Sequence, residues 1–153
     1  MKTQIERYHD ISVGHRVVGH ENKCRHLHGH NYRVHFTCEL EDGYTLDQVG
    51  RVIDFSDVKE RLCMWLESHW DHKFLVWNQD PVFCDIIHFM DTGNDSLNIL
   101  VDSIVWLDFN PTAENLARYL VEVIGPIQLL GTHVKLVKVK IEETSKCSAS
   151  FEI

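Results

Sequence analysis

Hydrophobic and polar side chains alternate along two stretches in the N-terminal part of the chain. In residues 2–14 the apolar side chains, such as Ile11 and Val13, occupy odd positions, while most even positions are polar. In residues 31–40 the alternation is complete, with an apolar or aromatic side chain at Tyr32 and at every second position after it. A period of two is typical of strands that bury one face. Both stretches therefore predict β-strands.

The hydrophobic period becomes longer after Asp54. Apolar residues recur at helical spacing through residues 55–69, which predicts an amphipathic helix capped by Asp54 or Ser56. A second helix is predicted to begin at the N-cap Thr112 and to end at the Gly-Pro pair at 125–126.

The segment between these two helices has a weaker pattern. Residues 80–103 combine a short helical pattern from Pro81 to Phe89 with turn-forming residues at 91–95. Residues 104–107 are apolar and predict a short strand.

Alternation returns near the C-terminus, in residues 133–141, and residues 148–153 supply a last strand. The order is therefore two strands, a helix, the variable segment, a helix and two strands. Strands grouped around a helical block are typical of an α+β fold with an antiparallel sheet. We expect one domain over residues 1–153, with other copies of the chain covering the free face and edges of the sheet.

The charge balance and the ends of the chain exclude two classes of partner. The net charge is −8, from 15 Lys and Arg against 23 Asp and Glu, which excludes a generally basic nucleic-acid-binding surface. The first residues lack the apolar core of a signal peptide, and no stretch approaches the roughly 18 apolar residues of a membrane helix. We therefore expect a cytoplasmic protein that binds neither nucleic acid nor membrane.

The five cysteines form no Cys-x-x-Cys pair, and their odd number leaves at least one thiol unpaired. Cys38 and Cys63 fall at apolar periodic positions and are interpreted as core residues. Cys24 instead lies between Lys23 and Arg25, whose positive charges favour the thiolate. Cys24 is therefore the cysteine with candidate chemistry.

Eleven histidines are the most unusual feature of the composition. His28 and His30 are two positions apart, so both imidazoles emerge on the strand face that carries Tyr32. If the chain turns back after His15, that ring comes to lie opposite them and supplies a third nitrogen. Three imidazoles with a vacant fourth position are typical of a catalytic metal site. Two alternatives stay open: histidines joined only by hydrogen bonds, and a structural metal site completed by Cys24.

Two further stretches carry candidate proton-transfer or ligand-binding groups. Asp71 directly precedes His72, and a carboxylate that orients an imidazole raises its basicity, although such pairs are also common without a function. Glu143 continues the apolar face of its strand after Ile141 and is predicted to point inward. An inward carboxylate must accept hydrogen bonds or bind a ligand, for example the N–H edge of a 2-aminopyrimidinone ring. The alternative is a strand-end glutamate that reaches solvent.

Together these motifs resemble the family of 6-pyruvoyltetrahydropterin and 6-carboxytetrahydropterin synthases over nearly the whole chain. The matching stretches are His15; Cys24 with His28-Gly29-His30-Asn31-Tyr32; Gly50-Arg51-Val52-Ile53-Asp54-Phe55; Asp71-His72-Lys73-Phe74-Leu75; Asn110-Pro111-Thr112-Ala113-Glu114-Asn115-Leu116; and Glu143-Thr144. The resemblance implies the tunnelling fold. In that fold an antiparallel four-stranded sheet has two helices between its second and third strands and assembles into an oligomeric barrel, commonly a hexamer.

Site residues are also implied by the resemblance, position by position. It implies one zinc ion per subunit, held by His15, His28 and His30. It further implies a thiolate base at Cys24, a second proton-transfer pair at Asp71 and His72, and a pterin anchor at Glu143 with Thr144.

The implied reaction converts 7,8-dihydroneopterin triphosphate and water into 6-carboxy-5,6,7,8-tetrahydropterin, acetaldehyde and triphosphate, a step towards queuosine and related 7-deazapurines. The short spacing between Cys24 and His28 is more similar to this carboxy-forming branch than to the pyruvoyl-forming one. The triphosphate needs nearby cations, and Arg16, Lys23 and Arg25 are the nearest in sequence. The alternatives are the pyruvoyl-forming reaction, a pterin side-chain lyase of the folate branch, and a zinc-stabilised pterin-binding module without turnover.

Overall fold

The two N-terminal strands form a long antiparallel hairpin, β1 (Gln4–His15) and β2 (His28–Leu40). Residues 2–90 and 95–153 of the computed structural model are described, with side chains outside 89–97. Both predicted strands are confirmed, and β2 begins earlier than expected, at His28. Its pairing with β1 places His28 opposite His15 and His30 opposite Val13.

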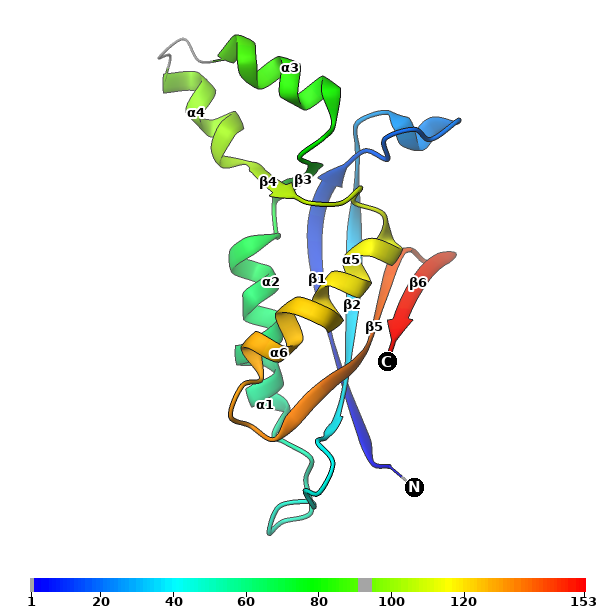
Figure 1. Cartoon of the computed structure of the whole chain (residues 1–153), viewed down its shortest axis with the longest axis vertical. Helices are drawn as coiled ribbons and strands as arrows, with labels where there is room; N and C mark the ends of the chain where they lie inside the picture. Colours follow the sequence, from blue (N-terminus) through cyan, green and yellow to red (C-terminus); the bar gives the residue numbers. More distant parts are fainter. Residues whose placement is uncertain (1, 91–94) are drawn as a thin grey trace.

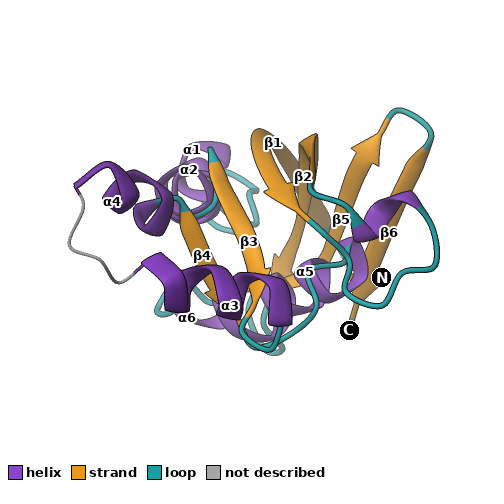
Figure 2. Ribbon diagram, turned by 90° about the horizontal axis from the view of Figure 1, so that it is seen from above, coloured by secondary structure: helices purple, strands orange, loops and turns teal. Residues whose placement is uncertain are grey.

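The hairpin lies at the centre of a six-stranded mixed sheet with the order β4-β3-β1-β2-β5-β6 (Figure 2). On one side β5 (Val134–Thr144) and β6 (Cys147–Glu152) continue the antiparallel pairing. On the other side β3 (Lys73–Trp77) pairs parallel with β1, and β4 (Ile104–Leu107) pairs parallel with β3. The prediction of a four-stranded antiparallel sheet is therefore wrong for this chain, because β3 and β4 extend the sheet with parallel strands.

Gly14 explains how β3 comes so close to β1. Its pairing with β3 places it beside Phe74. A Cβ atom at Gly14 would overlap the Phe74 ring, so only glycine admits the ring at this position. The aromatic ring therefore lies directly over the backbone of β1, next to the strand end that carries His15.

The first helical block matches the predicted range. It consists of α1 (Phe55–Val58), a π-helical turn (Lys59–Cys63) and α2 (Met64–His69). The carboxylate of Asp54 accepts from the Ser56 N–H at 2.8 Å, which is the predicted N-cap.

The second helical block runs further than expected. It consists of α5 (Ala113–Tyr119), a π-helical turn (Leu120–Ile124) and α6 (Gly125–Gln128), and Thr112 is its N-cap as predicted. The prediction that the helix ends at Gly-Pro 125–126 is wrong. The π-helical turn shifts the hydrogen-bond register, so Pro126 falls in the first turn of α6, where no N–H is required.

An inserted segment separates β3 from β4 and carries α3 (Pro81–Met90) and α4 (Asp95–Asp102). Figure 1 shows these two helices at the end of the molecule opposite the N-terminus. The predicted short helix and short strand are confirmed, and most of the predicted turn, residues 91–94, lies outside the described residues. The expectation of only two helices between the second and third antiparallel strands is therefore wrong, because the insertion adds two strands and two helices there. Within the described residues, no helix combines the length and apolarity needed to cross a membrane.

The core lies between the sheet and the two helical blocks. Odd positions of β1 and even positions of β2, such as Ile11 and Val34, join Leu66 of α2 and Leu116 of α5 in one buried cluster. Cys38 and Cys63 are buried, as predicted. We call this side of the sheet the helix-covered face. The opposite side, on which the alternate residues of β1 and β2 lie, is polar and is called the open face.

Candidate metal centre and active site

Three histidines converge at one end of the helix-covered face. His15, at the end of β1, is opposite His28, at the start of β2, and His30 is two positions further along the same strand. One ring nitrogen from each of the three lies within 4.8 Å of the others. His15 is 1% exposed, so the cluster is enclosed by protein on one side.

The hydrogen bonds of the rings direct nitrogen atoms towards the centre of this cluster. The Nδ1–H of His15 donates to the Pro111 carbonyl at 2.7 Å, and that of His28 donates to the His26 carbonyl at 2.7 Å. These bonds leave Nε2 of both rings as an acceptor, which is the usual arrangement of a metal-ligating histidine. In the described part of the chain, the buried Nε2 atoms of His28 and His30 have no hydrogen-bond partner. The residues therefore fit a divalent metal ion.

Burial also favours the protonation state that binds a metal. It lowers the pKa of His15 and of His30, because a protonated ring loses solvation there. Glu143 partly opposes this effect on both rings, and the Pro111 carbonyl opposes it at His15. The lowered pKa of His15 and of His30 therefore favours the neutral ring, the form in which histidine binds metals.

Cys24 does not complete the cluster. Among the described residues, the three histidines form the group whose ligand atoms converge, and Cys24 is not part of it. Cys24 lies half-buried in a short 3₁₀ turn, η1 (Lys23–Arg25), and its carbonyl accepts from the Val17 N–H at 2.7 Å. This arrangement favours a centre with a vacant position over a structural site closed by sulfur.

Glu143 points to the same face as the histidines and is linked to them by Tyr32. The Tyr32 hydroxyl donates to Glu143 Oε1 at 3.3 Å and lies 3.3 Å from Nδ1 of His15. The Tyr32 ring stacks on His30, with centroids 5.3 Å apart. Burial and the neighbouring Glu143 raise the pKa of Tyr32 well above its ordinary value, so the hydroxyl stays protonated. The alternation placed Tyr32 on the apolar face and the family resemblance included it in the His28–Tyr32 motif, but neither shows what its hydroxyl reaches.

Asp71 and His72 form the predicted pair at the edge of β1. Asp71 Oδ2 lies 2.9 Å from His72 Nδ1, and Asp71 Oδ1 accepts from the Ser12 N–H at 2.9 Å. Partial burial acts to raise the pKa of Asp71, but the hydrogen bonds from Ser12 and His72 lower it below its usual value. His72 has a left-handed backbone, φ 59°, fixed by its N–H bond of 2.7 Å to the Ser12 carbonyl. Its side chain is 80% exposed.

The Asp71–His72 pair belongs to the open face, not to the face of the histidines. A cavity of about 650 Å³ lies beside the pair, and its lining includes Asp10, Ser12, Asn31, Arg33, Glu142 and Thr144. These strand residues alternate with those that point to the helix-covered face. Thr144 is therefore on the side opposite to its neighbour Glu143, and its hydroxyl accepts from the Lys146 N–H in the β5–β6 turn. Within one chain, the side chains of the two predicted halves therefore face opposite sides of the sheet, and a second cavity of about 670 Å³ at the edge of β1 is lined by both His28 and His72.

The predicted cations have different surroundings. Arg16 donates to both carboxylate oxygens of Asp80, at 2.7 and 3.0 Å, and to the Arg25 carbonyl at 2.8 Å. Arg25 donates to the Glu21 carbonyl at 2.9 Å, and Lys23 is exposed. These contacts favour a structural role for Arg16 over the predicted binding of triphosphate, which stays a prediction for all three residues. Sequence analysis missed Asp80, since a lone aspartate before a proline carries no signal beyond a turn.

Known proteins resemble this chain over nearly its whole length. The family profile described as 6-pyruvoyl tetrahydropterin synthase matches residues 4–153. A protein of Rickettsia typhi named 6-carboxy-5,6,7,8-tetrahydropterin synthase is 31% identical over 138 residues, which are 90% of this chain and 91% of the relative. The protein of the same name from Aquifex aeolicus is 29% identical, over 99% of both chains.

Solved structures show the same arrangement of elements. An uncharacterized protein from Wolinella succinogenes superimposes with a TM-score of 0.85 and 26% identity, covering 99% of this chain and 98% of that one. The 6-pyruvoyl tetrahydropterin synthase of Caenorhabditis elegans superimposes with a TM-score of 0.64 and 21% identity, covering 100% and 96%. With the profile match over residues 4–153, the conclusion is direct: this chain belongs to the 6-pyruvoyl tetrahydropterin synthase family.

Proposed function

We propose that the protein is a zinc-dependent 6-carboxy-5,6,7,8-tetrahydropterin synthase. It would convert 7,8-dihydroneopterin triphosphate and water into 6-carboxy-5,6,7,8-tetrahydropterin, acetaldehyde and triphosphate, a step towards queuosine or another 7-deazapurine. The observation that carries the proposal is the cluster of His15, His28 and His30, with unpartnered Nε2 atoms on His28 and His30 and with Cys24 outside the ligand set. The names of the relatives from Rickettsia typhi and Aquifex aeolicus support the same reaction.

The predicted site residues around the histidine cluster each have a role in this proposal. The three histidines would hold the zinc ion, which when bound supplies a positive charge that acidifies substrate hydroxyls. Glu143 would accept hydrogen bonds from adjacent N–H groups of the pterin, held in place by the Tyr32 hydroxyl. Cys24, as a thiolate, would remove a proton from the substrate side chain, since its turn lies next to the start of β2.

The open face would supply the second proton-transfer pair to another copy of the chain. Asp71 orients His72, whose exposed ring can exchange protons with a substrate held elsewhere. Because the side chains of this pair and of the histidine cluster face opposite sides of the sheet, one chain alone offers two incomplete half-sites. We therefore propose a homo-oligomer, with a hexamer favoured. In it the histidine cluster of one copy would lie next to His72 and Thr144 of another. Lys23 and Arg25 would attract the triphosphate at the same junction.

The proposed reaction is tested by incubating the zinc-loaded protein with 7,8-dihydroneopterin triphosphate and identifying the products by mass. The wild-type protein should release acetaldehyde, and Cys24→Ala should not. Tetrahydropterin product without acetaldehyde would identify the pyruvoyl-forming reaction instead. Tight pterin binding without any product would identify a binding module.

A further inference from the structure

Arg16 and Asp80 form an enclosed ion pair that the proposed chemistry does not use. The guanidinium of Arg16 donates from Nε and from one terminal nitrogen to the two oxygens of Asp80, at 2.7 and 3.0 Å. The Asp80 side chain is 1% exposed and that of Arg16 is 15% exposed. An enclosed pair of this kind has a single favourable geometry, because either charge without its partner is poorly solvated.

The third nitrogen of the same guanidinium connects the pair to the turn that carries Cys24. It donates to the carbonyl of Arg25, the residue after Cys24, at 2.8 Å. A second bond, from the Val17 N–H to the Cys24 carbonyl at 2.7 Å, joins the same two segments. The carbonyls of Cys24 and of the next residue are therefore attached to the two residues that follow β1, and one of these attachments depends on the orientation of Arg16.

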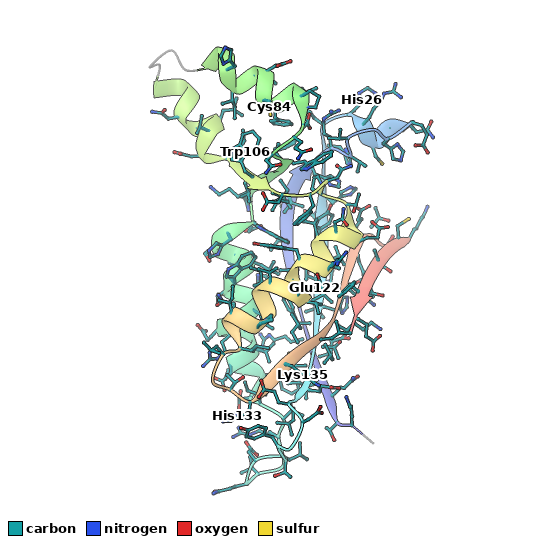
Figure 3. The ribbon with its side chains drawn as sticks, in the orientation of Figure 1. His26, Cys84, Trp106, Glu122, His133 and Lys135 are labelled. Carbon is teal, nitrogen blue, oxygen red and sulfur yellow. The ribbon has the colours of Figure 1, made fainter. Side chains whose placement is uncertain are left out.

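Asp80 fixes that orientation from the inserted segment. It is the residue before α3, and its carboxylate accepts from the Val82 N–H at 3.0 Å while its carbonyl accepts from the Cys84 N–H at 3.0 Å. Figure 3 places His26, just after the Cys24 turn, and Cys84, on α3, at the same end of the molecule. The inserted segment is thus connected to the Cys24 turn by the Asp80 carboxylate, which bonds to Arg16.

We propose that Asp80 is a positioning residue that acts through Arg16 to hold the Cys24 thiol at the metal centre. The proposal rests on the function proposed above for the catalytic use of Cys24, but the position of the thiol is measurable without turnover. Asp80→Asn keeps the helix cap, because asparagine caps as well as aspartate, and removes the charge and one of the two acceptor oxygens that orient Arg16. We call the Asp80–Arg16–Arg25 carbonyl contacts the brace. Its loss frees the turn that carries Cys24, so the thiol becomes more accessible to solvent and is held less precisely at the metal centre.

The experiment measures iodoacetamide alkylation of each cysteine by peptide mass spectrometry, together with zinc content, kcat and KM. In Asp80→Asn and Arg16→Gln we expect alkylation of Cys24 to rise about fivefold, as for a locally loosened segment, and that of Cys147 to stay unchanged. We expect kcat to fall about tenfold with little change in KM, the effect of a misplaced reacting group. The double variant should lower kcat no further than the stronger single variant.

The matched control is Asp54→Asn, a second helix cap paired with an arginine but on the far helical block. It should leave Cys24 alkylation and kcat at wild-type values. Wild-type alkylation of Cys24 in folded Asp80→Asn overturns the proposal, whatever kcat does. If Asp80→Asn does not fold, Arg16→Lys is measured instead, because a lysine cannot bond to Asp80 and to the Arg25 carbonyl at once. Wild-type alkylation of Cys24 in folded Arg16→Lys would equally overturn the proposal. A wild-type protein without turnover refutes the proposed function alone, since the alkylation comparison still tests the brace.

Discussion

The two faces of the sheet place histidines in opposite environments. On the helix-covered face His15 is 1% exposed, its pKa is lowered by burial, and its partners are a backbone carbonyl and a tyrosine hydroxyl. On the open face the His72 side chain is 80% exposed and bonded to the carboxylate of Asp71. The first environment suits an uncharged ligand of a metal, and the second suits a ring that gains and loses protons.

The odd or even position of a residue along its strand, more than its type, decides which face of the sheet its side chain serves. Successive side chains of a strand point to opposite faces, so Glu143 and Thr144 are neighbours in sequence but lie on opposite sides of the sheet. In the proposed homo-oligomer, a substrate that needs both environments would contact two copies of the chain.

Removing one ring from the helix-covered face should abolish the metal centre. His28→Ala is expected to lower bound zinc from about one ion per chain to near zero and activity by about 10⁴-fold or more, because two imidazoles hold the ion poorly. Metal analysis and turnover measure both effects. The control His26→Ala keeps the backbone carbonyl that orients His28 and should retain zinc. Full zinc content in His28→Ala would contradict the assignment of this ligand.

Mixing two inactive variants tests whether the faces of different copies cooperate. Cys24→Ala and His72→Ala should each lose about 10²- to 10⁴-fold in kcat, the usual contribution of a proton-transfer group. Mixed oligomers, refolded together in equal amounts, should regain roughly a quarter of wild-type activity, since that fraction of sites combines two intact halves. A mixture as inactive as its components would show that both halves of each site come from one chain.

A smaller change affects only the link between Tyr32 and Glu143. Tyr32→Phe removes the hydroxyl that donates to the carboxylate, which should raise KM about tenfold, the value of roughly 1.5 kcal/mol for a hydrogen bond to a charged group. Little change in kcat or zinc content is expected. Steady-state kinetics and metal analysis provide the measurements. Tyr8→Phe is the matched control on the open face, where the ring is half exposed and stacks with Arg33. Equal effects of both variants on KM would contradict the role of Tyr32.

The last prediction concerns Glu39 on the open face and the dependence of the free energy of unfolding on acidic pH. Hydrogen bonds from Lys2, Gln4 and Lys135 lower the pKa of Glu39 to about 2 from an ordinary value of 4.5. A carboxyl with a lower pKa in the folded state stabilises it above pH 4.5, and this contribution is lost as the pH falls towards 2. Glu39→Gln should therefore flatten the pH dependence of the free energy of unfolding in that window, measured by urea denaturation. If the slope of the free energy of unfolding against pH is the same in Glu39→Gln as in the wild type, groups other than Glu39 cause the loss of stability in acid.

Much of the central hairpin could be predicted because its signals are local. The period of two assigned the faces of β1 and β2, and the same parity placed His15, His28 and His30 together before any pairing was known. The helix at 55–69 followed equally from its spacing and its Asp54 cap. In each case the information lies within a few residues of the element that it describes.

The errors concern features decided by distant segments. Lys73–Trp77 has no alternation, and it becomes a strand through parallel pairing with the distant β4 and, at Val13 and Gly14, with β1. The helix passes through Pro126 because a π-helical turn before it changes the hydrogen-bond register. The partner of Arg16 lies 64 positions away in an insertion, and no local pattern identifies it.

The brief pairing of β3 with β1 has a consequence for assembly. The two strands share a register only at Val13 and Gly14, whereas β2 accompanies β1 along its full length. The outer margin of β1 from Gln4 to Ile11 is therefore available to a strand from a neighbouring subunit, and β3 forms a physical stop at its upper end. In the proposed oligomer, this stop would limit how far a neighbouring strand can shift along β1, so β3 would set the offset between adjacent subunits.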